Sequence, residues 1–264
     1  MIKDLFFNLK LTCNACGCEI FAGYFCKECA EKMKINDKYC FKCGRSVISE
    51  GNICSFCYGK GQFYEKSRSA FLYIEPVSML IKSMKFNGKK YLADIFGEIL
   101  APFVIKEFAD ADLITYVPMH KKDLRKRGYN QTYLIAKKIC LLTGYKFSDV
   151  LEKTVRTKKQ IKLNKNERLF NLKQAFSVKD KNEIKYKNVL VIDDVLTTGA
   201  TAEAISERLY RAGAETVYVL TVASVGEREM KRKEEKKNGK ELSFFGKIFK
   251  KKCLHKEKNI RSDL

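Results

Sequence analysis

The chain has 264 residues, of which 45% are apolar and 31% are charged, and its formal net charge is +21. This length supports one well-buried core with a smaller appended unit, and no run approaches the roughly 18 apolar residues that a membrane span needs. The first residues carry no secretory signal with a cleavage site, so we expect a cytoplasmic protein.

The positive charge is concentrated after residue 60. Residues 1–60 carry +3, residues 61–225 carry +11 and residues 226–264 carry +7. Two zinc ions, each on four thiolates, would add about −2 per site and bring the first segment to roughly −1. A positive field of this kind favours polyanions: nucleic acid, an anionic membrane face or phosphorylated ligands. A lysine-rich surface without such a partner is the alternative.

Residues 1–60 are predicted to form a double zinc ribbon. Nine of the eleven cysteines fall within Cys13–Cys57, and eight of these form four CxxC pairs. In a reducing compartment this grouping indicates metal binding, because each pair supplies two ligands of a tetrahedral zinc site. A repeat, CxxCG followed by GxxCxxC, favours two structural sites with sequential pairing, namely Cys13, Cys16, Cys26 and Cys29, then Cys40, Cys43, Cys54 and Cys57.

Several alternatives for this segment remain open. Interleaved pairing is possible, Cys18 is a substitute for Cys16 that falls outside the repeat, and iron–sulfur or redox dithiols are other uses of such pairs. The ribbons serve either as a folded clamp or as a surface that contacts nucleic acid or a protein partner.

Residues 61–225 are predicted to form an α/β domain with a mainly parallel, doubly wound sheet, because strand and helix patterns alternate. The expected strands are Ala70–Ile74, Leu113–Val117, Asn188–Ile192 and Thr216–Ala223. The expected helices are Pro76–Lys85, Tyr91–Phe108, Asn130–Leu142 and Ala200–Ala212. Residues 226–264 have no strand pattern and are predicted to be a basic, flexible tail.

A basic loop is expected after Leu113–Val117. Its cations can meet a pyrophosphate or a nucleic-acid backbone, and the candidates are Lys121, Lys122, Arg125 and Arg127. Gly128 permits a tight turn, and Tyr129 offers a face for stacking. A solvated loop without a ligand is the alternative.

Two adjacent carboxylates, Asp193 and Asp194, stand at the carboxyl end of a buried apolar strand, where ligands bind in open α/β sheets. The Thr-Thr-Gly-Ala-Thr turn that follows opens a helix, so its hydroxyls and N–H groups form a cradle for an anion. A sugar diol suits the carboxylates, and its phosphate suits the turn. The candidate ligand-binding residues are therefore Asp193, Asp194, Thr197, Thr198, Gly199, Ala200 and Thr201.

The alternative for this stretch is an N-capped helix after a strand, which does not explain the two carboxylates. The motif GxxxxGK(S/T) does not occur, which excludes a P-loop nucleoside triphosphatase. The stretch resembles the phosphoribosyl pyrophosphate motif of the phosphoribosyltransferase fold. That resemblance implies ribose hydroxyls on Asp193 and Asp194, the 5-phosphate on Thr197–Thr201, and Mg²⁺ bridging ribose and pyrophosphate oxygens.

The order of the motifs resembles the ComF family, also called ComFC or GntX. Four CxxC knuckles precede a VPxxxxxxRxRGYNQ segment, an Arg- and Asn-containing connection that ends in Ala175-Phe176, and VLVIDDVLTTGAT. The resemblance covers about residues 10–225. It implies a double zinc ribbon joined to a phosphoribosyltransferase fold, and a role in natural transformation with phosphoribosyl pyrophosphate and single-stranded DNA as partners.

Whether the chain is an enzyme stays open. Transfer from phosphoribosyl pyrophosphate needs electrostatic stabilisation of the leaving pyrophosphate, for which Asp194 is the candidate catalytic residue beside the basic loop. The chain has only two histidines, and no nucleobase pocket is recognisable after Ala223. We therefore expect a DNA-handling competence protein that binds the sugar phosphate, with a phosphoribosyltransferase of nucleobase salvage as the alternative.

The tail contains a basic amphipathic segment, with Phe245, Ile248 and Phe249 on one helical face among lysines. A solvated tail is the expected state of this segment. Because such a segment can also lie on an anionic membrane surface, our hypothesis is peripheral contact with the inner membrane or the DNA-uptake machinery. Stacking of the phenylalanines on bases is a further alternative.

Overall fold

The computed structural model describes residues 11–47, 53–155, 174–227 and 229. Its described residues up to Val225 belong to one compact unit. The amphipathic tail segment and residues 156–173 of the predicted connection lie outside the described residues. The boundaries expected between residues 1–60, 61–225 and 226–264 stay a prediction. Within the described residues, no helix is long and apolar enough to cross a membrane.

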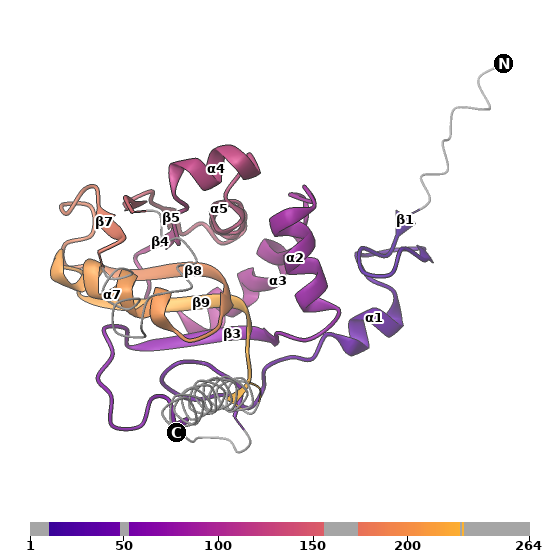
Figure 1. The fold of residues 1–264 in the computed structure, drawn as a ribbon, viewed down its shortest axis with the longest axis horizontal. Helices are drawn as coiled ribbons and strands as arrows, with labels where there is room; N and C mark the ends of the chain where they lie inside the picture. Colours follow the sequence, from indigo (N-terminus) through magenta and orange to yellow (C-terminus); the bar gives the residue numbers. More distant parts are fainter. Residues whose placement is uncertain (1–10, 48–52, 156–173, 228, 230–264) are drawn as a thin grey trace, which may run out of the picture. The chain divides into compact units, whose positions relative to one another are not determined.

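A five-stranded parallel sheet forms the centre of this unit, in the order β3-β9-β8-β4-β5 (Figure 1). The strands are β3 (Lys66–Leu72), β4 (Leu113–Tyr116), β5 (Lys146–Phe147), β8 (Asn188–Leu196) and β9 (Thr216–Ser224). A side pair, β6 (Leu151–Lys153) with β7 (Phe176–Val178), is antiparallel. The predicted α/β class with a mainly parallel sheet is confirmed.

Both faces of the sheet are covered, because alternate residues of its central strands face opposite ways. Leu190 and Ile192 of β8 belong to one hydrophobic cluster, together with residues of α2 (Val77–Phe86), α3 (Leu92–Glu107) and α5 (Gln131–Thr143). Val189 and Val191 belong to a second cluster, together with residues of α7 (Ala200–Arg211). The continuous apolar run of β8 is explained by this two-sided burial.

The cysteine segment contributes a small hairpin, β1 (Leu11–Thr12) with β2 (Glu19–Ile20), and one helix, α1 (Lys27–Lys32). Residues 34–42 then follow the outer edge of β3. Asn36 donates its backbone N–H to the Ala70 carbonyl at 2.9 Å, and the Lys42 carbonyl accepts from the Ser67 N–H at 2.9 Å. These bonds satisfy backbone groups that an edge strand otherwise leaves open.

Three predictions about local structure are wrong. The segment expected as a basic loop contains the helix α4 (Lys121–Arg127), which begins where the His120 side chain accepts from the Lys122 N–H and ends at Gly128 with φ +84°. The first expected strand, Ala70–Ile74, is displaced because β3 begins pairing with β9 at Lys66 and ends at Leu72. Strand β8 also runs past Ile192 to Leu196, since β9 continues beside it to Ser224.

Candidate functional site

The predicted acidic pair lies in the second half of β8, toward the carboxyl end of the sheet. Asp193 is paired in register with Thr221 of β9, and the neighbouring strand β4 has already ended at Tyr116. The Val117 N–H still donates to the Ile192 carbonyl at 3.0 Å. Both carboxylates therefore project where β4 stops and its following loop turns away, the position at which open α/β sheets bind ligands.

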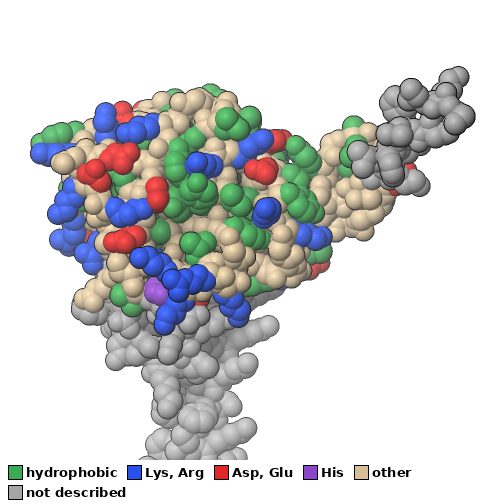
Figure 2. Space-filling model, turned by 90° about the horizontal axis from the view of Figure 1, so that it is seen from above, with side chains coloured by type: hydrophobic (Ala, Val, Ile, Leu, Met, Phe, Trp, Pro, Cys, Tyr) green, Lys and Arg blue, Asp and Glu red, His purple; other side chains and the backbone are tan. Residues whose placement is uncertain are grey.

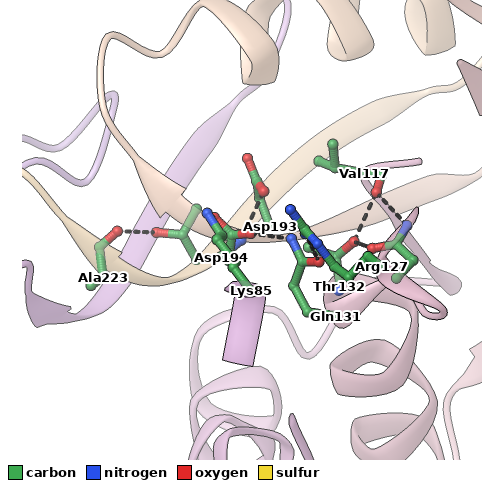
Figure 3. A network of polar contacts seen from close by, with 10 residues as sticks. Lys85, Val117, Arg127, Gln131, Thr132, Asp193, Asp194 and Ala223 are labelled. Atoms are coloured by element: carbon green, nitrogen blue, oxygen red, sulfur yellow. Dashed lines mark hydrogen bonds and ion pairs between the residues drawn. The ribbon is translucent and has the colours of Figure 1, made fainter. Parts of the chain in front are cut away.

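Asp194 is buried and held by two side chains from different helices (Figure 3). Lys85, near the end of α2, donates from Nζ to Asp194 Oδ1 at 2.5 Å. Gln131, the first residue of α5, donates from Nε2 to Asp194 Oδ2 at 2.5 Å. Each carboxylate oxygen thus has one donor, and the orientation of Asp194 is fixed from both sides.

The network continues from Gln131 to the predicted basic segment. Arg127 donates from Nη1 to Gln131 Oε1 at 2.6 Å, and its guanidinium lies 5.4 Å from the centre of the Phe86 ring. Asn130 caps α5 by accepting from the Thr132 N–H at 3.1 Å. The cap sets where α5 begins, and so it sets where Gln131 meets Asp194.

Asp193 differs from Asp194 in its partners. Its Oδ1 accepts the Asp194 backbone N–H at 2.8 Å. Burial, followed by the neighbouring Asp194 carboxylate, raises the pKa of Asp193 to about 7, against the opposing charges of Lys85 and Lys153. The pKa of Lys153 is in turn lowered by burial, against the charges of Asp123 and Asp193. A pKa of about 7 places Asp193 between its charged and neutral forms at neutral pH.

The turn after β8 presents backbone and hydroxyl groups at the start of α7. Thr197 and Thr198 are exposed, while Gly199, Ala200 and Thr201 are half-buried. Gly199 precedes the helix with φ +82°, a left-handed conformation that favours glycine, and it supplies no side-chain cap. The Ala200 N–H donates to Thr198 Oγ1 at 3.3 Å. The turn has the form expected of an anion cradle at a helix N-terminus.

The four predicted cations divide into two groups. Lys121, Lys122 and Arg125 are exposed on α4, whereas Arg127 is half-buried and joined to the Asp194 network. Lys and Arg side chains gather beside the histidine on the face drawn in Figure 2. The Tyr129 hydroxyl donates to the Met84 carbonyl, and the role of its ring as a stacking face stays a prediction.

The eight CxxC cysteines come together in two sequential tetrads, Cys13, Cys16, Cys26 and Cys29, and Cys40, Cys43, Cys54 and Cys57. The four Sγ atoms of each tetrad lie within 4.8 Å of one another. Four thiols at this spacing fit a tetrahedral zinc ion, so each tetrad could bind zinc. Cys18 Sγ lies 3.3 Å from Cys16 Sγ, next to the first tetrad.

Sequence reasoning assigned no role to several residues of this region. Gln131 lies in the RxRGYNQ motif, whose fixed spacing after the basic residues was the available signal. Lys85 and Arg45 gave no signal, because each reaches the site only through the tertiary fold. Arg45, from the second tetrad's knuckle, donates from Nη2 to the Thr197 carbonyl at 2.7 Å.

Comparison with protein-family models agrees with this architecture. A model of the family described as phosphoribosyl transferase domain matches residues 97–254, more than half of the chain. The match extends past the boundary predicted at Val225. Among solved structures, glutamine phosphoribosylpyrophosphate amidotransferase from B. subtilis is 22% identical and covers 50% of this chain and 26% of its own, with a TM-score of 0.38.

Curated relatives match over most of their own length. Competence protein F of Haemophilus influenzae is 28% identical over 225 residues, covering 83% of this chain and 98% of the relative. DNA utilization protein YhgH of Salmonella typhimurium is 27% identical over 200 residues, 74% of this chain and 87% of the relative. Competence protein ComFC of Streptococcus pneumoniae is 27% identical over 195 residues, 73% of this chain and 84% of the relative.

Proposed function

The chain belongs to the phosphoribosyl transferase domain family, and on that premise we propose that it is a ComF-like competence protein that binds phosphoribosyl pyrophosphate between β8 and α7. The observation that carries the proposal is the acidic pair at the end of β8, followed directly by a glycine-containing turn that opens α7. Carboxylates accept hydrogen bonds from a sugar diol, and a helix N-terminus accepts a phosphate.

In this proposal each part of the ligand has its own partner. The ribose hydroxyls donate to Asp193 and Asp194, and the 5-phosphate lies in the turn Thr197–Thr201. Lys85 supports this arrangement, because its charge offsets the Asp194 carboxylate that would otherwise repel a polyanion. Mg²⁺ bound with the diphosphate would neutralise part of the phosphate charge beside the acidic pair.

A series of truncated ligands tests this division of the site. Phosphoribosyl pyrophosphate with Mg²⁺ should raise the melting temperature most and ribose 5-phosphate less, while ribose alone should leave it unchanged, because stabilisation grows with [L]/Kd. Ribose acting as strongly as ribose 5-phosphate, or no shift with any phosphorylated ligand, would contradict the proposed site.

An assay of pyrophosphate release distinguishes ligand binding alone from transfer of the phosphoribosyl group. The proposal places Asp194 in the site as a binding residue held by Lys85 and Gln131, and names no acceptor. Incubation with phosphoribosyl pyrophosphate, Mg²⁺ and a panel of nucleobases should release no pyrophosphate above the protein-free rate. Release that disappears in Asp193→Asn/Asp194→Asn would favour a phosphoribosyltransferase of nucleobase salvage instead.

We also propose single-stranded DNA as a partner, on the exposed cations of α4. Lys121, Lys122 and Arg125 are exposed on one short helix, and the relatives' printed names refer to competence and DNA utilization. Replacing all three by Ala should weaken binding of a labelled single strand and lower the salt slope by about 2, since each phosphate contact contributes about 0.7.

The matched control removes three exposed lysines from the cysteine segment, Lys27, Lys32 and Lys34. It should leave affinity and salt slope near the wild-type values. If only the control weakens binding, the DNA surface lies on the cysteine segment rather than on α4. Peripheral membrane contact through residues 242–252 stays a prediction outside the described residues.

A further inference from the structure

Arg45 is a buried cation of the cysteine segment that reaches the predicted phosphate turn. Its side chain is 1% exposed and is among the largest fully buried side chains described. Nη2 donates to the Thr197 carbonyl at 2.7 Å, across 152 positions of sequence. Its Nε and Nη1 are buried without a hydrogen-bond partner. Burying a charge with two donors unpaired is costly, so this contact calls for a functional explanation.

The second cysteine tetrad holds Arg45 in place. Arg45 follows Cys43 by two residues, and its carbonyl accepts the Cys40 N–H at 2.8 Å. Its guanidinium lies 4.7 Å from the centre of the Phe56 ring, and Phe56 stands between Cys54 and Cys57. Both CxxC pairs therefore support the same side chain. Four thiolates on a zinc ion would also leave about two negative charges near this buried cation.

The same tetrad belongs to the hydrophobic cluster that also contains residues of α7. Cys40, Cys43, Cys54 and Cys57 share a hydrophobic cluster with Tyr64 and with Ala202 and Ile205 of α7. The Tyr64 hydroxyl lies 4.0 Å from the point where a Gly199 Cβ would stand. The thiolates, the tyrosine and the turn thus form one continuous region.

The first tetrad has no such connection among the described residues. Its segment instead contacts the face of the sheet that α2, α3 and α5 cover. There Tyr24 donates to Glu98 of α3 at 2.5 Å, and Phe25 packs against the hydrophobic cluster of those helices. The two tetrads share a sequence repeat, yet only the second supports a donor to the turn.

We propose that Arg45 is a positioning residue that couples the second tetrad to the phosphate turn, so that metal in this tetrad sets the order of Thr197–Thr201 and its affinity for a phosphorylated sugar. The geometry of the peptide bond explains how. In a trans peptide the C=O of Thr197 and the N–H of Thr198 point in opposite directions. Holding the carbonyl toward Arg45 therefore turns the N–H toward the opposite side, where a phosphate can accept it. This inference rests on the proposed binding of a sugar phosphate.

Hydrogen exchange of the turn tests the coupling without any ligand. In the full, zinc-loaded chain, Arg45→Met should make the amides of residues 198–201 exchange about tenfold faster, because a charge-assisted hydrogen bond to the turn is lost. Arg68→Met is the matched control. Arg68 also joins β3 to the cysteine segment, because it donates to the Phe41 carbonyl at 3.1 Å, but it does not reach the turn. It should leave exchange of the turn unchanged.

A second pair of variants tests the role of the metal. Cys43→Ser, in the second tetrad, should speed exchange of the same amides, whereas Cys16→Ser, in the first, should not. Unchanged exchange in Arg45→Met, or an equal rise in Arg68→Met, would overturn the coupling. Should Arg45→Met fail to fold, Arg45→Lys keeps the charge but is too short to place a donor where Nη2 stands, so it should also raise exchange of the turn.

Calorimetry with phosphoribosyl pyrophosphate and Mg²⁺ then links the coupling to the ligand. Arg45→Met should raise the dissociation constant about tenfold, and Arg68→Met should leave it unchanged. If the wild-type chain binds no ligand, the proposed function fails while the exchange experiment still decides the coupling. If the ligand binds equally well to wild type and Arg45→Met, the proposed function stands and the coupling is wrong.

Discussion

At the residue scale, the acidic pair combines two different electrostatic environments on adjacent positions. Asp194 has a charged donor and an amide donor, one to each oxygen, whereas Asp193 accepts a backbone N–H and has Asp194 as its neighbour. The first arrangement fixes a carboxylate and the second raises a pKa. The orientation of Asp194 is therefore fixed, whereas the protonation of Asp193 changes with pH near neutrality.

The ion pair of Lys85 with Asp194 should contribute measurably to stability. Lys85→Met leaves one oxygen of a buried carboxylate without its donor, so the free energy of unfolding should fall by about 2 kcal/mol. Lys82→Met, an exposed lysine on the same helix, should change it by less than about 0.5 kcal/mol. Urea unfolding measures both, and equal effects would contradict the pairing.

The raised pKa of Asp193 predicts a pH dependence of folding. The folded chain holds this proton up to about pH 7, whereas the unfolded chain releases it near 3.8, so the folded state binds more protons in between. Stability from this residue is greatest below the unfolded pKa and falls as the pH rises through about 7. Asp193→Asn should remove this part of the slope between about pH 5 and 7 in thermal unfolding. An exposed control, Asp37→Asn, should keep the wild-type slope.

At the element scale, the sequence predicted the long, apolar elements and missed the short or charged ones. The helix expected at Ala200–Ala212 is Ala200–Arg211, and the strand expected at Thr216–Ala223 is Thr216–Ser224. Strands β5, β6 and β7 have two or three residues each, too few for a period to be read. Helix α4 contains six charged residues in seven and has no apolar face to reveal it.

The repeat in the cysteine segment conceals a difference between its two knuckles. Gly17 and Gly44 follow the second cysteine of equivalent CxxC pairs, with φ +81° and +67°. A Cβ at Gly17 meets nothing within 4 Å, but one at Gly44 would lie 2.4 Å from the Ser67 carbonyl oxygen. The second knuckle is therefore pressed against the backbone of β3, and the first is not.

Replacing each glycine by alanine measures this difference. Gly17→Ala should cost about 1 kcal/mol for its left-handed backbone alone. Gly44→Ala should cost about 2 kcal/mol more in urea unfolding of the zinc-loaded chain, because β3 must also shift. Equal costs would show that the second knuckle is not docked on β3 as described.

At the scale of the whole molecule, the site is assembled from segments that are far apart in sequence. The acidic pair and the turn were predicted because they are contiguous, as were the cysteine tetrads from their spacing. Lys85, Gln131 and Arg45 come from α2, α5 and a cysteine knuckle, and only the packing of those elements on the sheet brings them to β8 and its turn. The RxRGYNQ motif was a local signal for Gln131, whereas no local pattern indicated Lys85 or Arg45.

The two tetrads predict two zinc ions per chain. Elemental analysis of the purified chain should give about two, since each set of four thiols forms a closed tetrahedral site. Cys16→Ser and Cys43→Ser should each lower this number. Cys140→Ser, a buried cysteine of α5 outside both tetrads, should keep it. Iron in place of zinc would contradict the assignment.

The central claim is that the end of β8 and the turn after it bind a phosphorylated ribose, and calorimetric titration of the full chain with phosphoribosyl pyrophosphate and Mg²⁺ tests it most directly. We predict saturable binding of one ligand per chain, lost in Asp193→Asn/Asp194→Asn and retained in Lys82→Met. Absence of binding to the wild-type chain, or binding that the double substitution leaves unchanged, would contradict the claim.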